Sequence, residues 1–293
     1  FHARDNVTTH GARFLSVCMR CNDSSDRRRC HHCHAPGTNV LPYLPLPNFQ
    51  RGSSFASTVG NAHYHSLQTK FTRRVSQGLN FLAAYTWAKS IDDASAFLGN
   101  RADKNFPQNS NNYAAERAVS SFDVRQRLAS ALVWQVPGRG RWSRNFEIRG
   151  LITVQTAPPF SSTLRFDNSN TGNTGGSFGS DRPDALRSPL LGSPAPDRWF
   201  DTTALPVAPR YSFGNAGRNI LRGSSLVQFD VALARAIRIS ERARISLECQ
   251  AFNLFNTSSF DLPQRFADEP VSFGKVFSAR PPRQIQLAAR LEW

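Results

Sequence analysis

Long apolar runs are missing from this chain. A transmembrane helix needs about 20 consecutive apolar residues, and no uninterrupted segment of the sequence reaches that length. A helical membrane protein is therefore excluded. With 293 residues, 40% of them hydrophobic, the chain is long enough for one large or two ordinary domains. Because the strands of a membrane barrel are half polar, this composition fits a barrel as well as a soluble all-β domain.

Signals for enzymatic chemistry are also missing. The chain has no G-x-S-x-G nucleophile elbow, and most of its histidines lie near the amino terminus, apart from His63 and His65 at a strand start. Asp92, Asp93 and Glu116 lie in a long polar segment, where we expect solvated charges and not an acid/base pair. The sequence thus predicts a protein that is not an enzyme and has no catalytic or cofactor-binding residues.

A calcium loop is indicated only in part. The segment from Asp167 to Gly172 is similar to the opening of such a loop, but Phe178 stands where the bidentate glutamate should be. We therefore expect no calcium site there.

The net charge of +15 does not indicate nucleic-acid binding. Residues Arg27 to Arg29 form the only basic run, and no RNA-binding aromatic signature or recognition helix accompanies it. The other Arg and Lys residues are scattered through turns and polar strand faces. A basic wall facing a water-filled lumen explains them, so nucleic acid is not an expected partner.

Residues 1–43 differ from the rest of the chain, because they hold four of the five cysteines and show no period-two pattern. Cys18, Cys21, Cys30 and Cys33 have a spacing compatible with zinc, and Cys30 to His34 also spells a haem-attachment motif without an apolar pocket around it. A wrong reading frame, an unrelated junction, chance cysteines or a disulfide pair would also explain these residues. No metal or cofactor is assigned, and we predict a domain boundary between this irregular segment and residues 44–293.

Period-two alternation of apolar and polar residues dominates the remaining sequence. A strand has a side-chain period of two, so such a segment has one apolar and one polar face. The last strand ends on Trp293 and has about the ten residues that a tilted strand needs to cross a bilayer. Seven segments show the pattern: 66–75, 79–88, 128–136, 146–155, 227–234, 244–251 and 284–293. An eighth strand is expected near Phe273 to Phe277. The predicted fold is an all-β antiparallel meander of seven to eight strands.

The connections between these segments alternate in length. Residues 76–78, 137–144 and 239–242 are short turns, whereas 91–122, 165–222 and 257–282 are long, polar and rich in Asn, Ser, Gly and Pro. Outer-membrane barrels have short turns on one rim and long loops on the other. Aromatic residues near strand ends fit interfacial girdles or an ordinary core: Tyr85, Trp87, Trp134, Trp142, Phe146 and Trp293.

Several ordered blocks resemble the Oar-like branch of TonB-dependent outer-membrane receptors. They are Tyr64–Gln68, Arg73–Arg74, Gly78–Leu79, Tyr85–Asp93, Glu116–Arg117, Ser121–Arg125, Phe213–Asn219, Leu221–Gly223, Phe252–Asn256, Phe273–Gly274 and Pro281–Gln286. The resemblance runs from about residue 44 to residue 293.

This resemblance implies the carboxy-terminal part of a barrel of about twenty-two strands, a size whose lumen is plugged. The plug and the box read by TonB are not recognisable in this chain, so we expect a fragment that cannot transport alone, because its two sheet edges would be unpaired. The implied location is the outer membrane. The implied partners are its lipid, the barrel-assembly machinery at the terminal strand, TonB through the missing plug, and an extracellular ligand at the long loops.

A second class of protein also fits the sequence: a soluble or surface-exposed β-rich binding or adhesion module with an amino-terminal zinc knuckle. The two classes differ in where the apolar stripes face, which is lipid in a barrel and a protein core in a soluble module.

Overall fold

The computed structural model describes residues 58–75, 78–95, 106–138, 145–171, 181–240 and 243–293. The predicted segment 1–43, with its cysteine motif and basic run, lies outside the described residues, as do Trp142 and Phe178.

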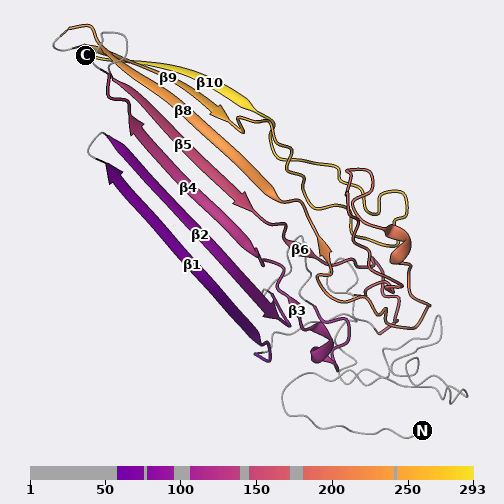
Figure 1. The fold of residues 1–293 in the computed structure, drawn as a ribbon. Helices are drawn as coiled ribbons and strands as arrows, with labels where there is room; N and C mark the ends of the chain where they lie inside the picture. The colour runs from indigo at the N-terminus through magenta and orange to yellow at the C-terminus, as the bar shows by residue number, and fades with distance from the viewer. Residues whose placement is uncertain (1–57, 76–77, 96–105, 139–144, 172–180, 241–242) are drawn as a thin grey trace, which may run out of the picture.

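Seven long strands form one antiparallel meander, in which each strand pairs with the next long strand along the chain (Figure 1). They are β1 (Ala62–Val75), β2 (Leu79–Asp92), β4 (Gln126–Gln135), β5 (Phe146–Gln155), β8 (Leu226–Arg238), β9 (Arg244–Phe252) and β10 (Gln284–Glu292). The short β3 (Ala118–Val119) pairs with the end of β2, while β6 (Pro159–Phe160) and β7 (Leu221–Arg222) form a separate small sheet. All seven strands with alternating sequence are thus confirmed.

Helix in the described ranges is confined to two single turns, η2 (Tyr113–Glu116) and η3 (Thr202–Ala204). Within the same ranges, no helix has the length and apolar character that crossing a membrane would require.

The strand expected near Phe273 to Phe277 was a wrong prediction. Gly274 has a φ of 78°, which interrupts any extended conformation, and the neighbouring residues form a turn. Phe273 is instead buried in a hydrophobic cluster between the long loops. The apolar residues of this segment therefore belong to the packing within a loop and not to a strand.

Strand register places all the apolar stripes on a single face of the sheet, which we call the apolar face. Leu67 lies opposite Trp87, and Tyr85 lies opposite Leu128 on the next strand. The same alignment continues through β5, β8 and β9 to β10, where Leu287 lies opposite Cys249. Direct cross-strand neighbours share a face, so the seven stripes form one continuous surface.

Charged residues are distributed very unequally over the two faces. Within the paired segments, the apolar face carries three, which are Arg73, Lys89 and Arg235. The opposite face, which we call the polar face, carries twelve: Lys70, Arg74, Asp92, Arg127, Glu147, Arg149, Asp230, Arg238, Arg244, Glu248, Arg290 and Glu292.

The uncharged part of the apolar face covers most of the height of a membrane barrel's apolar band. On β1 and β2, the span between the levels of Arg73 and Lys89 carries no charge on this face. Arg73 lies opposite Phe81, so the span is eight residues of β2, or about 26 Å along the strand. At the strand tilt of roughly 35–45° in membrane barrels, this length gives about 19–22 Å of height, compared with an apolar band of about 25 Å.

The two rims of the sheet differ as the connection lengths predict. The hairpin connections β1–β2, β4–β5 and β8–β9 lie at one end, together with the carboxy terminus, and the three long connections lie at the other end (Figure 1). This arrangement confirms the prediction of short turns on one rim and long loops on the opposite one.

The buried hydrophobic residues lie mostly in the loops and not on the sheet. Phe160, Phe200, Leu205 and Leu221 are essentially inaccessible, whereas Leu67 on the apolar face of β1 is 55% exposed. Several more large residues of the apolar face are exposed: Phe71, Tyr85, Trp87, Leu233, Ile237, Leu247, Ile285, Leu287 and Leu291. In a soluble sandwich, a second sheet would pack on this face and form a core with it. None of the described segments covers the face in this way.

The sheet is open, because β1 and β10 each have one neighbour among the described strands. An unpaired strand edge cannot be tolerated in hydrocarbon, where no water satisfies its backbone groups. In the membrane, both edges therefore need a hydrogen-bonding partner.

Two adjacent alanines on β2 test the assignment of the faces. Ala83 lies on the apolar face opposite Phe71, and Ala84 lies on the polar face opposite Lys70. We expect Ala83→Arg to destabilise the membrane-embedded protein by about 2–4 kcal/mol, because it places a charge in lipid near mid-strand. Ala84→Arg should cost much less, since its side chain reaches water. Urea unfolding in lipid vesicles measures both, and a larger effect for Ala84→Arg would show that the faces are reversed.

Candidate functional site: a loop assembly anchored on the polar face

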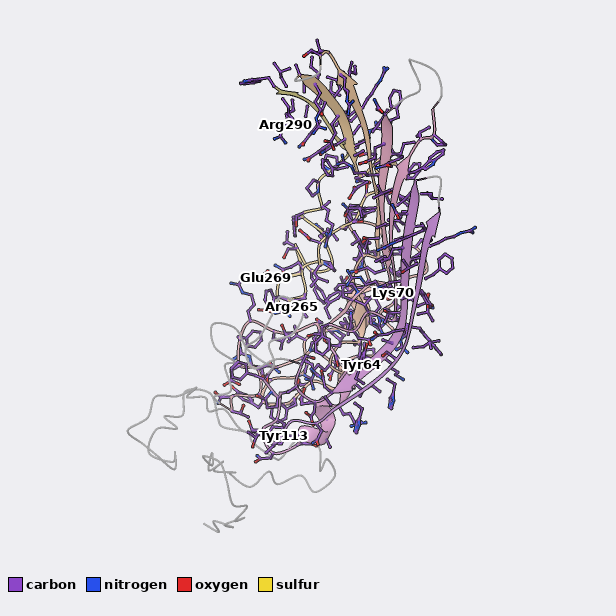
Figure 2. All side chains as sticks on the ribbon, turned by 90° about the vertical axis from the view of Figure 1, so that its left-hand side faces the viewer. Tyr64, Lys70, Tyr113, Arg265, Glu269 and Arg290 are labelled. Carbon is purple, nitrogen blue, oxygen red and sulfur yellow. The ribbon has the colours of Figure 1, made fainter. Side chains whose placement is uncertain are left out.

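The described residues of the three long connections, 93–95 with 106–125, 156–171 with 181–225, and 253–283, form one folded unit that we call the loop assembly. It lies beside one face of the sheet near the loop rim, and Figure 2 shows Arg265 and Glu269 on it, with Arg290 at the far end of the sheet. Its contacts with Asp92 and Asp230 place it against the polar face.

An aromatic core joins the second and third connections of the loop assembly. The rings of Phe200 and Phe273 meet edge to face with centroids 5.1 Å apart, and Phe160 of β6 packs on Phe200 at 6.1 Å. Trp199 contributes its ring to the same cluster and donates its indole hydrogen to the Arg222 carbonyl at 2.8 Å. These rings supply the buried apolar area that a long connection needs to adopt one structure.

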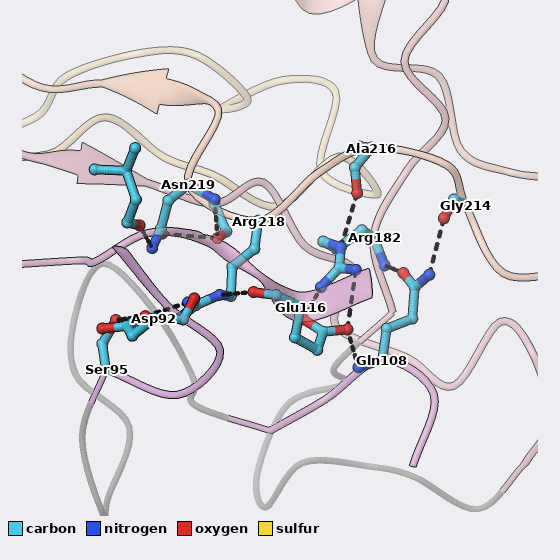
Figure 3. Close-up of polar contacts among 11 residues, drawn as sticks. Asp92, Ser95, Gln108, Glu116, Arg182, Gly214, Ala216, Arg218 and Asn219 are labelled. Carbon is cyan, nitrogen blue, oxygen red and sulfur yellow. Dashed lines mark hydrogen bonds and ion pairs between the residues drawn. The ribbon is translucent and has the colours of Figure 1, made fainter. Parts of the chain in front are cut away.

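Glu116 and Arg182 form a buried bidentate ion pair between the first and second connections (Figure 3). The two guanidinium nitrogens donate to the two carboxylate oxygens over 2.6 and 3.1 Å. Arg182 Nε also donates to the Ala216 carbonyl at 2.8 Å, and Gln108 donates its backbone hydrogen to Glu116 Oε1 at 3.0 Å. The pair thus joins the first and second connections inside the loop assembly.

A second buried ion pair attaches the loop assembly to the sheet. Arg218 donates to the side chain and to the carbonyl of Asp92, the last residue of β2, and its Nε donates to the Glu116 carbonyl at 2.9 Å (Figure 3). The Ser95 hydroxyl accepts from Arg218 at 3.0 Å. One arginine thus binds the strand end and the 3-10 turn together.

The neighbouring Asn219 extends this attachment to β3 and β6. Its side-chain amide donates to the Val119 carbonyl at 2.8 Å, and its backbone N–H donates to the hydroxyl of Ser161, the residue after β6, at 2.9 Å. Asn219 has a φ of 57°, a left-handed conformation that asparagine tolerates better than most residues. An asparagine at this position therefore tolerates the left-handed backbone conformation and also supplies the side-chain hydrogen bond to Val119.

The expectation that Asp92 and Glu116 are solvated charges was wrong. Both are only 1% exposed, because arginines from a distant connection neutralise them. Asp93 is half-buried and accepts from the Asn61 backbone at 2.8 Å. Sequence reasoning missed Arg182 and Gln108 entirely, and no local pattern marks them.

The segment that is similar to a calcium loop forms a turn stabilised by its own side chains. Asp167 accepts from the Ser169 hydroxyl and the Thr171 backbone, each at 3.1 Å. Ser169 in turn donates its backbone hydrogen to Asp181 at 2.7 Å. Burial raises the pKa of Asp181 to about 6, and the nearby Asp167 carboxylate adds to this shift, while the hydrogen bonds from Ser169 oppose it.

Metal ligands are not gathered anywhere in the described ranges, where no three His, Cys, Asp or Glu side chains could hold an ion together. Asp92 Oδ2 and Asp123 Oδ2 are buried without a hydrogen-bond partner, but each carboxylate uses its other oxygen in the network.

A cavity of about 270 Å³ lies where β9 ends, between the start of β8 and the approach to β10. Phe252, Asn253, Ser259 and Arg280 are among its lining residues. Its lining thus joins the sheet to the third long connection.

The buried Glu116–Arg182 pair should make the loop assembly harder to open. We expect Arg182→Ala to destabilise it by about 3–5 kcal/mol, because Glu116 would be left buried without its partner. The control is Arg187→Ala, which removes the pair of the exposed Arg187 with Asp201 and should cost about 0–1 kcal/mol. Protease cleavage rates of the loops on intact cells compare the two variants. Equal rates would contradict a stabilising role for the buried pair.

The raised pKa of Asp181 predicts the direction in which the stability of the loop assembly changes with pH. Its folded pKa of about 6 lies above the ordinary 3.8, so the fold favours the protonated carboxyl. The contribution of Asp181 to loop stability is then greatest below about pH 4 and is lost as the pH rises through 6. Asp181→Asn should remove this decline, and proteolysis rates between about pH 4 and 8 measure it. A wild-type profile that rises over this range would contradict the assignment.

Comparison with protein-family models agrees with the geometry. The model described as an outer membrane beta barrel domain matches residues 7–286. No curated protein and no solved structure gives a significant match. The protein is therefore located in the outer membrane, and the apolar face of its sheet faces lipid, so the alternative of a soluble module is wrong. The chain belongs to the outer membrane beta barrel domain family.

Proposed function

We propose that this chain forms the carboxy-terminal wall of a larger TonB-dependent receptor of the Oar-like type. The observation that carries the proposal is an open seven-stranded sheet with a highly charged polar face and a folded loop assembly on its outer rim. A barrel large enough to hold a plug would complete such a sheet, and its lumen would be lined by the polar face.

The blocks that resemble Oar-like receptors have a common physical role, which supports the proposal. Asp92, Glu116, Asp123 and Arg218 come from different blocks, and all four take part in the network that attaches the loops to the sheet. Gly214 belongs to the same set, because a Cβ there would collide with the carbonyls of Arg182 and Pro183. These residues hold the loops together and attach them to the sheet.

In this proposal, the extracellular ligand contacts the outer surface of the loop assembly. Exposed large apolar side chains there include Phe166, Leu186, Val271 and Phe277, of which Val271 and Phe277 are 82% and 73% exposed. An aromatic core and two buried ion pairs order the loops that carry these side chains, which reduces the ordering cost of binding.

The remaining partners follow from the same proposal. TonB would act through a plug, and the barrel-assembly machinery would recognise β10, whose apolar residues Ile285, Leu287 and Leu291 are exposed. We also propose that the protein is not an enzyme, because two of its buried carboxylates, Asp92 and Glu116, are held in ion pairs.

Energy-dependent uptake tests the proposal. In cells carrying the complete gene product, we expect labelled metal chelates or oligosaccharides to accumulate only with an intact proton-motive force. Deletion of the gene should abolish accumulation, and Val271→Ser with Phe277→Ser should weaken binding at the cell surface several-fold. Accumulation that continues without the proton-motive force would indicate a porin, and binding without accumulation would indicate a surface receptor that does not transport.

A further inference from the structure

Three basic side chains lie together on the apolar face at the loop rim. His63 and His65 are on β1, and Lys89 lies directly opposite His65 on β2. All three are exposed. Tyr64, which lies between the two histidines in sequence, marks this end of β1 in Figure 2. We call these three residues the basic rim patch.

Aromatic and aliphatic side chains lie directly below the basic rim patch. Trp87 is two residues before Lys89 on the same face and is paired with Leu67, and Tyr85 follows one step further down. Trp87 and Leu67 are 53% and 55% exposed. Aromatic side chains at this depth mark the boundary between hydrocarbon and headgroups, so the patch lies at the level of the outer-leaflet headgroups.

Three cations of the polar face have acidic partners. Arg149 pairs with Glu147 and Glu248, and both Arg244 and Arg290 pair with Glu292. These pairs neutralise part of the positive charge on this face.

The basic rim patch, in contrast, has no ion pair within the described ranges. Asp93, which follows the end of β2 near the patch, accepts instead from the backbone and the side chain of Asn61. Among the described residues, the charge of Lys89 is therefore not compensated, and the patch can receive an anionic group.

We propose that the basic rim patch binds the phosphate group of an anionic lipid in the outer leaflet. Lys89 supplies the positive charge, and the two imidazoles supply hydrogen-bonding groups beside it. Leu67 and Trp87 contact the acyl chains of the same lipid. This site lies on the outside of the wall and does not depend on whether the protein imports a ligand.

Native mass spectrometry of the complete protein in detergent tests the site. The probes are a phosphorylated outer-leaflet glycolipid, its dephosphorylated form and inorganic phosphate. We expect His63→Ala/His65→Ala/Lys89→Ala to reduce binding of the phosphorylated lipid at least tenfold. Lys89→Arg should retain binding because it keeps the charge. Lys70→Ala is the matched control, because Lys70 is on the polar face of the same strand pair.

Each outcome either supports or overturns the proposal. Preference for the phosphorylated lipid that is lost in the triple variant and kept in Lys70→Ala supports it. Binding within twofold of wild type in the triple variant overturns it, and so does equal binding of the dephosphorylated lipid. Displacement by millimolar inorganic phosphate would show a site for free phosphate and would overturn the lipid assignment. Heat-modifiable gel migration of every variant confirms that it is folded.

Discussion

The register of antiparallel pairing determines which side chains each face of this sheet carries. Side chains alternate between faces along each strand, so a shift of one residue at any strand pair would move the apolar residues of that strand to the polar face. The observed register avoids this at all six long-strand pairings. One face can then lie against lipid while the other carries most of the charged residues of the sheet.

The loop assembly solves a different physical problem. Long connections lose much conformational entropy when they adopt one structure, and the aromatic core of these loops offsets part of that cost. Two buried ion pairs fix how the connections are arranged. Buried pairs add little net stability but penalise any arrangement that separates the charges. Arg218 reaches both the end of β2 and the 3-10 turn, so it makes the position of the loops depend on the position of the sheet. The outer surface is consequently held in place relative to the wall.

Different residues of the chain were predictable to different degrees. The strand around Tyr85 could be predicted because apolar and polar residues alternate along it. This alternation involves only neighbouring residues, and a strand with one face in lipid keeps it. The burial of Glu116 was not, since its partner Arg182 lies 66 residues away and belongs to no recognisable pattern. Phe273 misled for a related reason, because an apolar side chain in a loop core has the same local appearance as one in a strand.

The all-β class, the seven long strands and the alternation of short turns with long loops could be inferred from the sequence alone, because each depends on period-two patterning and turn composition within a few residues. Three features became visible only in the folded chain: the seven stripes share one face, Asp92 and Glu116 are buried, and His63, His65 and Lys89 meet at the rim. Those features depend on which distant segments are paired, and pairing is set by backbone hydrogen bonds and packing across the whole sheet.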